Sequence, residues 1–225
     1  MKVAIIGSGR IGSNIGIHAA RAGHDVTFSY SRDPRKLEDL AASAPSARAA
    51  SPADAARSAD VIAFSVPWTA VDDAIARAGS LEGKVVIDTT NQFGARGLEK
   101  LPDDATAIQT NARRMPGARL AKAFNTLTSD YQRNVAEGRV SGPVAMFYAT
   151  EDEHAAEVTA ELISTLRFVP VRIGRWREVR LIEAPRRDGA AYGEAYRPED
   201  AERIASAAAG DMEAAAQLAT QLKLA

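Results

Sequence analysis

The sequence predicts an α/β protein in which helices cover both faces of one mostly parallel, doubly wound sheet. Three observations lead to this fold class. Short β-branched runs alternate with alanine-rich helical segments through most of the 225 residues, as in proteins whose parallel strands are linked by helices. Several of the runs are apolar throughout, as strands buried on both faces are. Two further helical segments near the end predict a small helical appendage.

The predicted strands are short apolar runs, most of them rich in valine, isoleucine and aromatic residues. In chain order they are KVAII, DVTFSY, DVIAFSV, KVVIDTT, ARLAKAF, PVAMFYA and RFVPVRI, at residues 2–6, 25–30, 60–66, 84–90, 118–124, 143–149 and 167–173. Weaker strands are predicted at 47–50 and 106–110.

The helices expected between these strands follow from signals at their ends. Gly23 ends the first helix, and Asp33-Pro34 caps and opens the second. Glu151 and Asp152 place negative charge at the positive end of a helix dipole. The expected helices cover 10–22, 34–43, 68–78, 152–166, 198–209 and 211–224.

Composition excludes several classes of function. The formal net charge of −1 gives no general attraction to nucleic acid or to an anionic membrane. The chain has no cysteine for a disulfide, a thiolate or a metal, and its three histidines lack metal-ligand spacing. No apolar run approaches the about 18 residues of a membrane span, and no signal peptide is recognisable. We therefore expect a cytoplasmic protein without a metal site.

A glycine-rich motif directly follows the first predicted strand. Gly7-Ser8-Gly9-Arg10-Ile11-Gly12 reads G-x-G-x-x-G and opens a helix inside a strand–helix–strand unit of about 30 residues. In such a Rossmann-type dinucleotide site, the first glycine permits the turn, the second lets the backbone approach the pyrophosphate, and the third lets the helix pack on the strand. The helix N-terminus offers N–H groups to the phosphates, and Ser8 and Arg10 can add hydrogen bonds.

The end of the second strand indicates which nucleotide is bound. NAD sites carry an acid there that accepts hydrogen bonds from the ribose hydroxyls. Here the strand leads into Ser31 and Arg32, a hydroxyl and a guanidinium that match a 2′-phosphate. Arg35 and Lys36 add positive charge one turn later, and Asp33 is expected to cap the next helix. We therefore predict NADP(H) rather than NAD(H).

Three more loops follow strands at the same sheet edge, where open α/β sheets bind ligands. The SVPW loop runs from Ser65 through Pro67 to Trp68, whose ring is either a flat surface beside the cofactor or plain core. The DTTN and KAFN loops supply the candidates at the nicotinamide end, which are Thr89, Thr90, Asn91, Phe124 and Asn125.

Together, KVAIIGSGRIGSNIGIHAARAGHDVTFSYSR, SVPW, VVIDTTN and KAFNTL resemble the NADPH-dependent coenzyme F-420 reductase family of dinucleotide-binding oxidoreductases, over about residues 2–173. The resemblance implies a Rossmann domain that binds NADP(H) and passes a hydride between nicotinamide C4 and a flavin-like acceptor, which could be the deazaflavin coenzyme F-420. It also implies a phosphate loop at Ser8, Gly9 and Arg10, a 2′-phosphate clamp at Ser31 and Arg32, and cofactor lining by Val66, Pro67, Asn91, Ala123 and Phe124.

The cofactor prediction can be stated as one set of positions. It comprises Gly7, Ser8, Gly9, Arg10, Ile11, Gly12, Ser31, Arg32, Lys36, Ser65, Val66, Pro67, Asn91, Ala123, Phe124 and Asn125. No catalytic residue is named, because hydride transfer between stacked rings needs little acid–base help from the protein. We also expect a small-molecule substrate and a homodimer.

The chain departs from the family pattern after Gly174, where its composition becomes basic and rich in turns. We therefore divide it into an NADP-binding Rossmann domain, 1–174, and an acceptor-side or dimerisation appendage, 175–225. In this region Trp176, Leu181, Ile182, Tyr192 and Tyr196 are interleaved with Arg177, Arg180, Arg186, Arg187 and Arg197. The pattern fits a pocket for an anionic aromatic acceptor, a dimer contact, or a solvated surface.

Two other functions stay open. An imine or small-carbonyl reductase shares the early glycine motif, but such enzymes add a large helical domain for which this chain is too short. A non-catalytic NADP(H)-sensing or regulatory protein would bind the nucleotide without oxidising it. Oxidation of NADPH that depends on an added acceptor separates an enzyme from a sensor.

Overall fold

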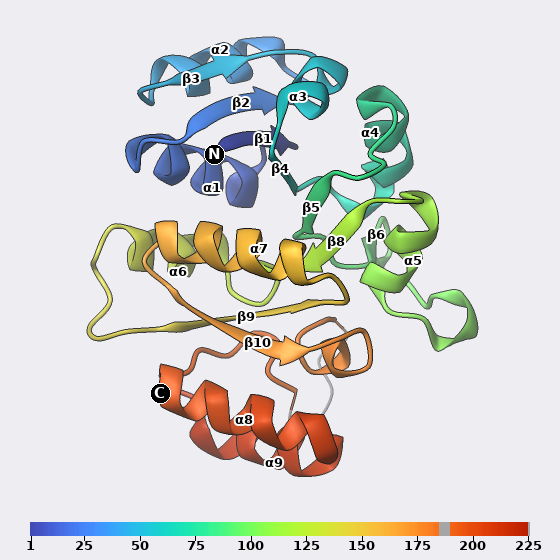
Figure 1. The fold of residues 1–225 in the computed structure, drawn as a ribbon, viewed down its shortest axis with the longest axis vertical. Helices are drawn as coiled ribbons and strands as arrows, with labels where there is room; N and C mark the ends of the chain where they lie inside the picture. The colour runs from blue at the N-terminus through green and yellow to red at the C-terminus, as the bar shows by residue number, and fades with distance from the viewer. Residues whose placement is uncertain (185–189, 225) are drawn as a thin grey trace.

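Figure 1 shows a computed structural model of the chain, which describes residues 1–184 and 190–224. Eight strands within these residues form one sheet in the order β10-β9-β8-β5-β4-β1-β2-β3. The strands are β1 (Lys2–Ile6), β2 (Asp25–Ser29), β3 (Ala47–Ala49), β4 (Val61–Phe64), β5 (Val85–Asp88), β8 (Arg119–Lys122), β9 (Ala145–Thr150) and β10 (Val169–Gly174).

The sheet is mostly parallel, as the sequence predicts. Strands β1 to β5 and β8 all run in one direction, and their order is that of a doubly wound dinucleotide-binding fold. Strand β9 pairs antiparallel with β8, and β10 then pairs parallel with β9. The predicted fold class is therefore confirmed, with an antiparallel extension at one side.

Helices lie on both faces of the sheet (Figure 1). They are α1 (Arg10–Arg21), α2 (Pro34–Ala42), α3 (Pro52–Ser58), α4 (Val71–Ala78), α5 (Ala107–Arg114), α6 (Ser129–Ala136), α7 (Glu153–Thr165), α8 (Pro198–Gly210) and α9 (Met212–Leu222). Short 3₁₀ helices η1 (Trp68–Ala70), η2 (Pro102–Asp104) and η3 (Glu178–Leu181) and the hairpin β6 (Phe93–Gly94) and β7 (Gly97–Leu98) complete the described elements.

Two apolar cores lie on opposite faces of the sheet, because successive side chains of a strand point to opposite sides. Val3 and Ile5 belong to the core that includes residues of α1 and α7, whereas Ala4 and Ile6 belong to the core that includes residues of α3, α4 and α8. No helix in the described ranges is both long and apolar enough to cross a membrane.

The strand predicted at 106–110 is wrong. This segment begins α5, and Thr106 and Gln109 form a capping box in which each side chain bonds the backbone of the other. The β-branched and apolar letters of TAIQT suggested a strand, but a Thr-x-x-Gln pattern is also a helix start, and here the helix signal prevails. The weak strand near 47–50 is confirmed as β3.

The C-terminal region covers the antiparallel extension of the sheet. Helix α8 packs on β10, and Ile204 and Ala208 of α8 belong to the same core as Phe147 of β9 and Ile173 of β10. Tyr196 is buried beside Phe147, with ring centroids 5.6 Å apart in an edge-to-face arrangement. Residues 190–224 therefore continue the core of the sheet, while the domain boundary at Gly174 stays a prediction.

Candidate active site

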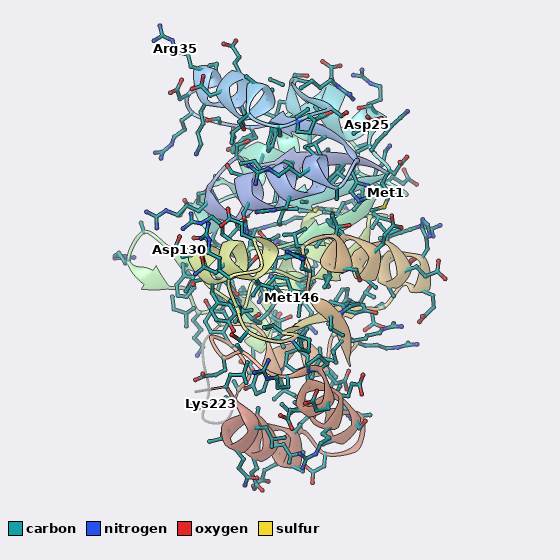
Figure 2. The ribbon with its side chains drawn as sticks, turned by 90° about the vertical axis from the view of Figure 1, so that its left-hand side faces the viewer. Met1, Asp25, Arg35, Asp130, Met146 and Lys223 are labelled. Atoms are coloured by element: carbon teal, nitrogen blue, oxygen red, sulfur yellow. The ribbon has the colours of Figure 1, made fainter. Side chains whose placement is uncertain are left out.

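The loops after β1, β4, β5 and β8 meet at the carboxyl edge of the parallel strands and enclose a cleft of about 490 Å³. In Figure 2 the labelled residues Arg35 and Asp130, which lie at this edge, are on the side opposite Met1 and Asp25, where β1 and β2 begin. The cleft is lined by Gly9, Arg10, Ile11, Ser65, Val66, Pro67, Trp68, Thr89, Thr90, Asn91, Phe93, Phe124, Asn125, Leu127, Thr128, Ser129 and Tyr192.

The glycine loop has the shape that a pyrophosphate requires. Gly7 has φ +104°, and a Cβ there would overlap the carbonyl group of Ser65. A Cβ on Gly12 would overlap the carbonyl oxygen of Gly7, so this glycine lets α1 approach the turn. Gly9 is different, because a Cβ there would meet nothing within 4 Å. The absence of a side chain at Gly9 thus leaves open space in front of the backbone, and a dinucleotide fits this loop.

The first turn of α1 is also free to receive an anion. No side chain caps the helix at Gly9, and the first turn contains no acidic residue. Its first N–H groups have no partner within the helix, and they carry the positive end of the dipole. Arg10 begins the helix, is exposed and lines the cleft. Ser8, by contrast, is buried, and its hydroxyl donates to the carbonyl of Ser29 at 3.3 Å.

The loop after β2 contains Arg32, whose guanidinium is available to a ligand. Arg32 is exposed and makes no ion pair or hydrogen bond with any residue that the structure describes. The Ser31 hydroxyl accepts from the N–H of Asp33 at 3.1 Å, and Asp33 in turn caps α2 by accepting from the N–H of Arg35. Lys36 lines a separate hollow between α1 and α6 that also includes Gly9 and Arg10.

Tyr30 sits between β2 and this loop in the left-handed conformation, with φ +60°. Its hydroxyl donates to the carboxylate of Asp73 on α4 at 2.7 Å. Burial and this hydrogen bond raise the pKa of Tyr30 to about 12. Tyr30 therefore connects the end of β2 to α4.

The loop after β4 is held by both backbone and side chain. The Ser65 N–H donates to the carbonyl of Ile6, and Val66 and Pro67 line the cleft. Trp68 is buried in the core and also lines the cleft, while its contact with a cofactor stays a prediction. Its indole N–H donates to Glu99 at 2.8 Å, and the Arg114 guanidinium lies 4.7 Å from the ring centroid.

Two asparagines join the loops after β5 and β8. The Asn91 amide donates to the carbonyl of Asn125 at 3.0 Å, and the Asn125 amide donates to the carbonyl of Ile182 at 2.6 Å. The side-chain oxygen of Asn125 is buried and has no partner among the described groups. Phe124 lines the cleft with φ +58°, whereas Ala123 is fully buried below it.

A buried charge cluster lies directly beneath these loops, and sequence reasoning missed it. The Lys122 side chain is completely buried, with its Nζ 3.3 Å from Asp88 and 3.2 Å from Glu183, and it donates to the carbonyl of Thr90. Burial alone would lower the pKa of Lys122, but the two carboxylates outweigh it and raise that pKa. Burial raises the pKa of Glu183, which Lys122 offsets only in part.

Glu183 also connects the C-terminal region to α5. Its carboxylate accepts from the N–H groups of Ala107 and Ile108, at 2.8 and 2.9 Å, in the first turn of that helix. A signal for part of this cluster was present, because Lys122 and Asp88 are charged residues inside otherwise apolar strand runs. Glu183 gave no local signal, since its partners are distant in the sequence.

The sequence-predicted residues therefore fall into three groups. Those that line the cleft together are Gly9, Arg10, Ile11, Ser65, Val66, Pro67, Asn91, Phe124 and Asn125. Those that shape it from behind are Gly7, Ser8, Gly12 and Ala123. Lys36 lines the neighbouring hollow that shares Gly9 and Arg10 with the cleft, whereas Ser31 and Arg32, in the loop after β2, line neither. Their roles toward a cofactor stay predictions.

From the appendage, Tyr192 reaches the cleft, whereas Leu181, Ile182 and Tyr196 are buried in the core. Trp176 packs half-buried against the same core. Arg177 donates to carbonyls at the end of α8, and Arg180 pairs with Asp104 at 2.9 Å. Arg186 and Arg187 lie outside the described residues. Arg197 likewise donates to the carbonyls of Ser141 and Pro143, so these three arginines bond other parts of the protein and do not line the cleft.

Comparison with known proteins agrees with this geometry. Residues 2–92 match the family described as NADP oxidoreductase, coenzyme F420-dependent. The family resemblance is confirmed. The matched residues hold the glycine loop and the loops after β2, β4 and β5, so the similarity to NADP-dependent oxidoreductases covers the part of the chain in which the sequence predicts the NADP site. No protein with curated function matches the sequence significantly.

Solved structures similar to this chain extend the likeness beyond the matched residues. A hypothetical protein from Sinorhizobium meliloti is 28% identical with a TM-score of 0.73, over 83% of this chain and 92% of its own. A provisionally assigned F420-dependent NADP reductase from Arthrobacter sp. FB24 is 25% identical with a TM-score of 0.67, over 80% and 87%. A reductive aminase from Aspergillus terreus, in complex with NADPH, is 21% identical with a TM-score of 0.58, over 78% of this chain and 55% of its own, and shows the fold alone.

Proposed function

We propose that this protein is an NADPH-dependent oxidoreductase that transfers a hydride between the nicotinamide and a flavin-like acceptor, with the deazaflavin coenzyme F-420 as the first candidate. The observation that carries the proposal is the single cleft that runs from the open backbone at Gly9 to the asparagine pair Asn91 and Asn125. Phosphates at one end and a ring at the other are what a bound dinucleotide presents.

The charges around the cleft support NADP(H). Arg32 is available for a 2′-phosphate, and the neighbouring Asp33 is engaged as the cap of α2 rather than turned toward a ribose. Arg10, in the first turn of α1, and Lys36, on α2, add positive charge to the hollow beside the glycine loop. A guanidinium binds a phosphate by charge-assisted hydrogen bonds, which a ribose hydroxyl would not offer. NADPH is therefore the preferred nucleotide.

The reaction needs no acid or base from the chain. When bound, the dihydronicotinamide supplies a hydride from C4, so that NADPH, the oxidised acceptor and one proton from water give NADP⁺ and the dihydro acceptor. The residues of the chain hold the two rings in contact and exclude water. Asn91 and Asn125, fixed by each other and by Ile182, are suited to orient an amide or a ring carbonyl.

Oxidation of NADPH by the purified protein tests this function. NADPH is mixed with the protein, and its absorbance is followed after the addition of oxidised coenzyme F-420, FMN or FAD in separate runs. Rapid oxidation with the deazaflavin is the expected result. Turnover only with a carbonyl compound and an amine would instead establish an imine or small-carbonyl reductase. Tight NADPH binding without any oxidation would establish a sensor.

The assembly and cellular location stay predictions. We expect a cytoplasmic homodimer that acts on a small molecule. Light scattering of the purified protein at several concentrations tests the dimer, and a mass that stays at one chain throughout would contradict it.

A further inference from the structure

Two large apolar side chains are exposed in the described part of the chain, and both lie on the β6–β7 hairpin. Phe93 is 49% exposed and Leu98 is 42% exposed. They are direct cross-strand partners, so they share one face of the hairpin. An apolar pair held in water on so small a hairpin is costly unless a ligand or partner covers it. The pair therefore points to an occupant.

The hairpin is fixed to the cleft rather than free. The N–H of Glu99 donates to the carbonyl of Gln92 at 2.8 Å, and the Gln92 amide donates to the carbonyl of Glu99 at 2.9 Å. The Glu99 carboxylate accepts from the Trp68 indole at 2.8 Å. Gly94 lies so close to this carboxylate that a Cβ would overlap it. Trp68, itself a wall of the cleft, thus holds the base of the hairpin in place.

This attachment places Phe93 at the nicotinamide end of the cleft. The N–H of Phe93 donates to the carbonyl of Asn91 at 2.7 Å, so the ring follows the asparagine in a tight turn. Phe93 lines the same cleft as Phe124 and Tyr192. Leu98 lines the neighbouring hollow instead. In Figure 2 the hairpin, drawn as a pale green arrow, projects from the body on the side of Asp130.

The charged residues that line the cleft limit the kinds of molecule that it can bind. Among the described residues that line the cleft, Arg10 is the one with a formal charge, and it lies beside the glycine loop. Among the residues that the structure describes, no carboxylate lines the cleft to hold an iminium ion, and no cation lines its nicotinamide end to hold the carboxylate of a hydroxy acid. Four aromatic residues, Trp68, Phe93, Phe124 and Tyr192, and two amides also line the cleft, and they suit an uncharged planar ring with carbonyl groups at its edge.

We infer that Phe93 forms the outer wall of the acceptor site and packs on the face or edge of a planar, uncharged aromatic ring. The inference rests on the proposed hydride transfer and specifies its substrate class. A second copy of the chain is a poorer occupant, because two side chains at the rim of a cleft fall far short of the roughly 800 Å² per partner that a stable interface buries.

Substitution of Phe93 tests the inference, with Leu98 as the matched control. Both side chains are exposed, so neither variant should unfold the protein. Phe93→Ala should raise the KM for the ring acceptor, and the Kd for oxidised FMN or coenzyme F-420 in the presence of NADP⁺, by roughly tenfold. Phe93→Tyr should restore both. Leu98→Ala should change neither by more than about twofold, and all variants should bind NADPH as the original protein does.

The failure of this inference and that of the proposed function give different results. If the original protein oxidises NADPH with a ring acceptor and Phe93→Ala leaves its KM and Kd unchanged, the inference is overturned and the function stands. If FMN or coenzyme F-420 binds but is never reduced, the proposed function fails. The effect of Phe93→Ala on that binding then still tests whether Phe93 forms the wall of the binding site. Dissociation of a dimer in the Phe93→Ala/Leu98→Ala variant would overturn the inference in favour of an interface between copies.

Discussion

At the scale of single residues, Arg32 carries the prediction with the clearest electrostatic reason. Its guanidinium is exposed and unpaired with any described group, so its loss should leave the fold intact. Arg32→Ala should weaken NADPH binding by at least roughly tenfold, because a charge-assisted hydrogen bond to phosphate is lost. NADH binding should change by no more than about twofold.

Titration of both nucleotides by tryptophan fluorescence measures this difference. Arg57→Ala is the matched control, since Arg57 is an exposed arginine on α3 whose partner is Asp54. An equal loss of NADPH and NADH affinity in the Arg32 variant would mean that this charge serves the loop and not the 2′-phosphate.

Tyr30 gives a prediction on pH. Burial and the hydrogen bond to Asp73 raise its pKa from the ordinary value of 10.0 to about 12. Below pH 10 both folded and unfolded chains keep the proton, and between the two values only the folded chain does. The free energy of unfolding should therefore fall as the pH rises through this window. In Tyr30→Phe the fall should be smaller by on the order of 1 kcal/mol, after solvent screening.

Urea unfolding at several pH values from neutral to alkaline measures the two slopes. The pKa values of Tyr131, Tyr148 and Tyr192 are also raised by burial, but these side chains are common to both proteins and cancel in the comparison. Identical slopes for the two proteins would contradict the assignment of this window to Tyr30.

At the scale of elements, the buried charges join strand β5, strand β8, helix α5 and the segment after η3. Lys122→Met would leave Asp88 and Glu183 buried without a cation, and we expect it to cost about 3–5 kcal/mol of stability. Glu183→Gln keeps the Lys122–Asp88 pair and an oxygen for the first turn of α5, so it should cost only about 1–2 kcal/mol.

Urea unfolding of the two variants at neutral pH gives both costs. The ranking is the informative result, because Lys122→Met leaves two buried carboxylates without a cation, whereas Glu183→Gln removes one of those carboxylates. If Glu183→Gln destabilised the protein as much as Lys122→Met, the two carboxylates could not both be sharing the charge of one lysine.

The elements also show where sequence reasoning succeeds. The strands and the glycine loop were predictable because their signals are local: apolar runs of strand length, and glycines at fixed spacing before a helix. The β6–β7 hairpin was not, because two residues in each strand make no periodic pattern. At 106–110, β-branching competed with the Thr106–Gln109 capping box, and only the structure decided between them.

The residues of the candidate site also divide into those that the sequence could predict and those that it could not. Gly9, Arg10, Pro67, Asn91 and Phe124 follow strand ends, so topology alone brings them to one edge of the sheet. Glu183 and Tyr192 reach this edge from a segment that returns to it after β10, and nothing near them in the sequence shows that return. Long-range contacts of this kind depend on the tertiary packing of the chain.

At the scale of the whole molecule, the region after Gly174 is expected to be required for folding. Its removal would uncover the face of β9 and β10 that α8 packs against, and would take Glu183 away from Lys122 and α5. A chain ending at Gly174 should therefore be insoluble or lack a cooperative thermal transition. Circular dichroism of the soluble fraction tests this expectation, and a truncated chain that unfolds cooperatively would contradict it.

The ends of the sheet limit how one chain can meet another. One edge is β3, with three residues, and the other is β10, which contains Pro170. The N–H of Val169 points inward to Val144, so the nitrogen of Pro170 faces outward, where it has no hydrogen to donate. A strand from another chain could therefore form only a few hydrogen bonds with β3, and its hydrogen bonds with β10 would be interrupted at Pro170. Fibril growth by strand addition is disfavoured at both edges, and the homodimer that the sequence predicts is expected to form through helices or loops.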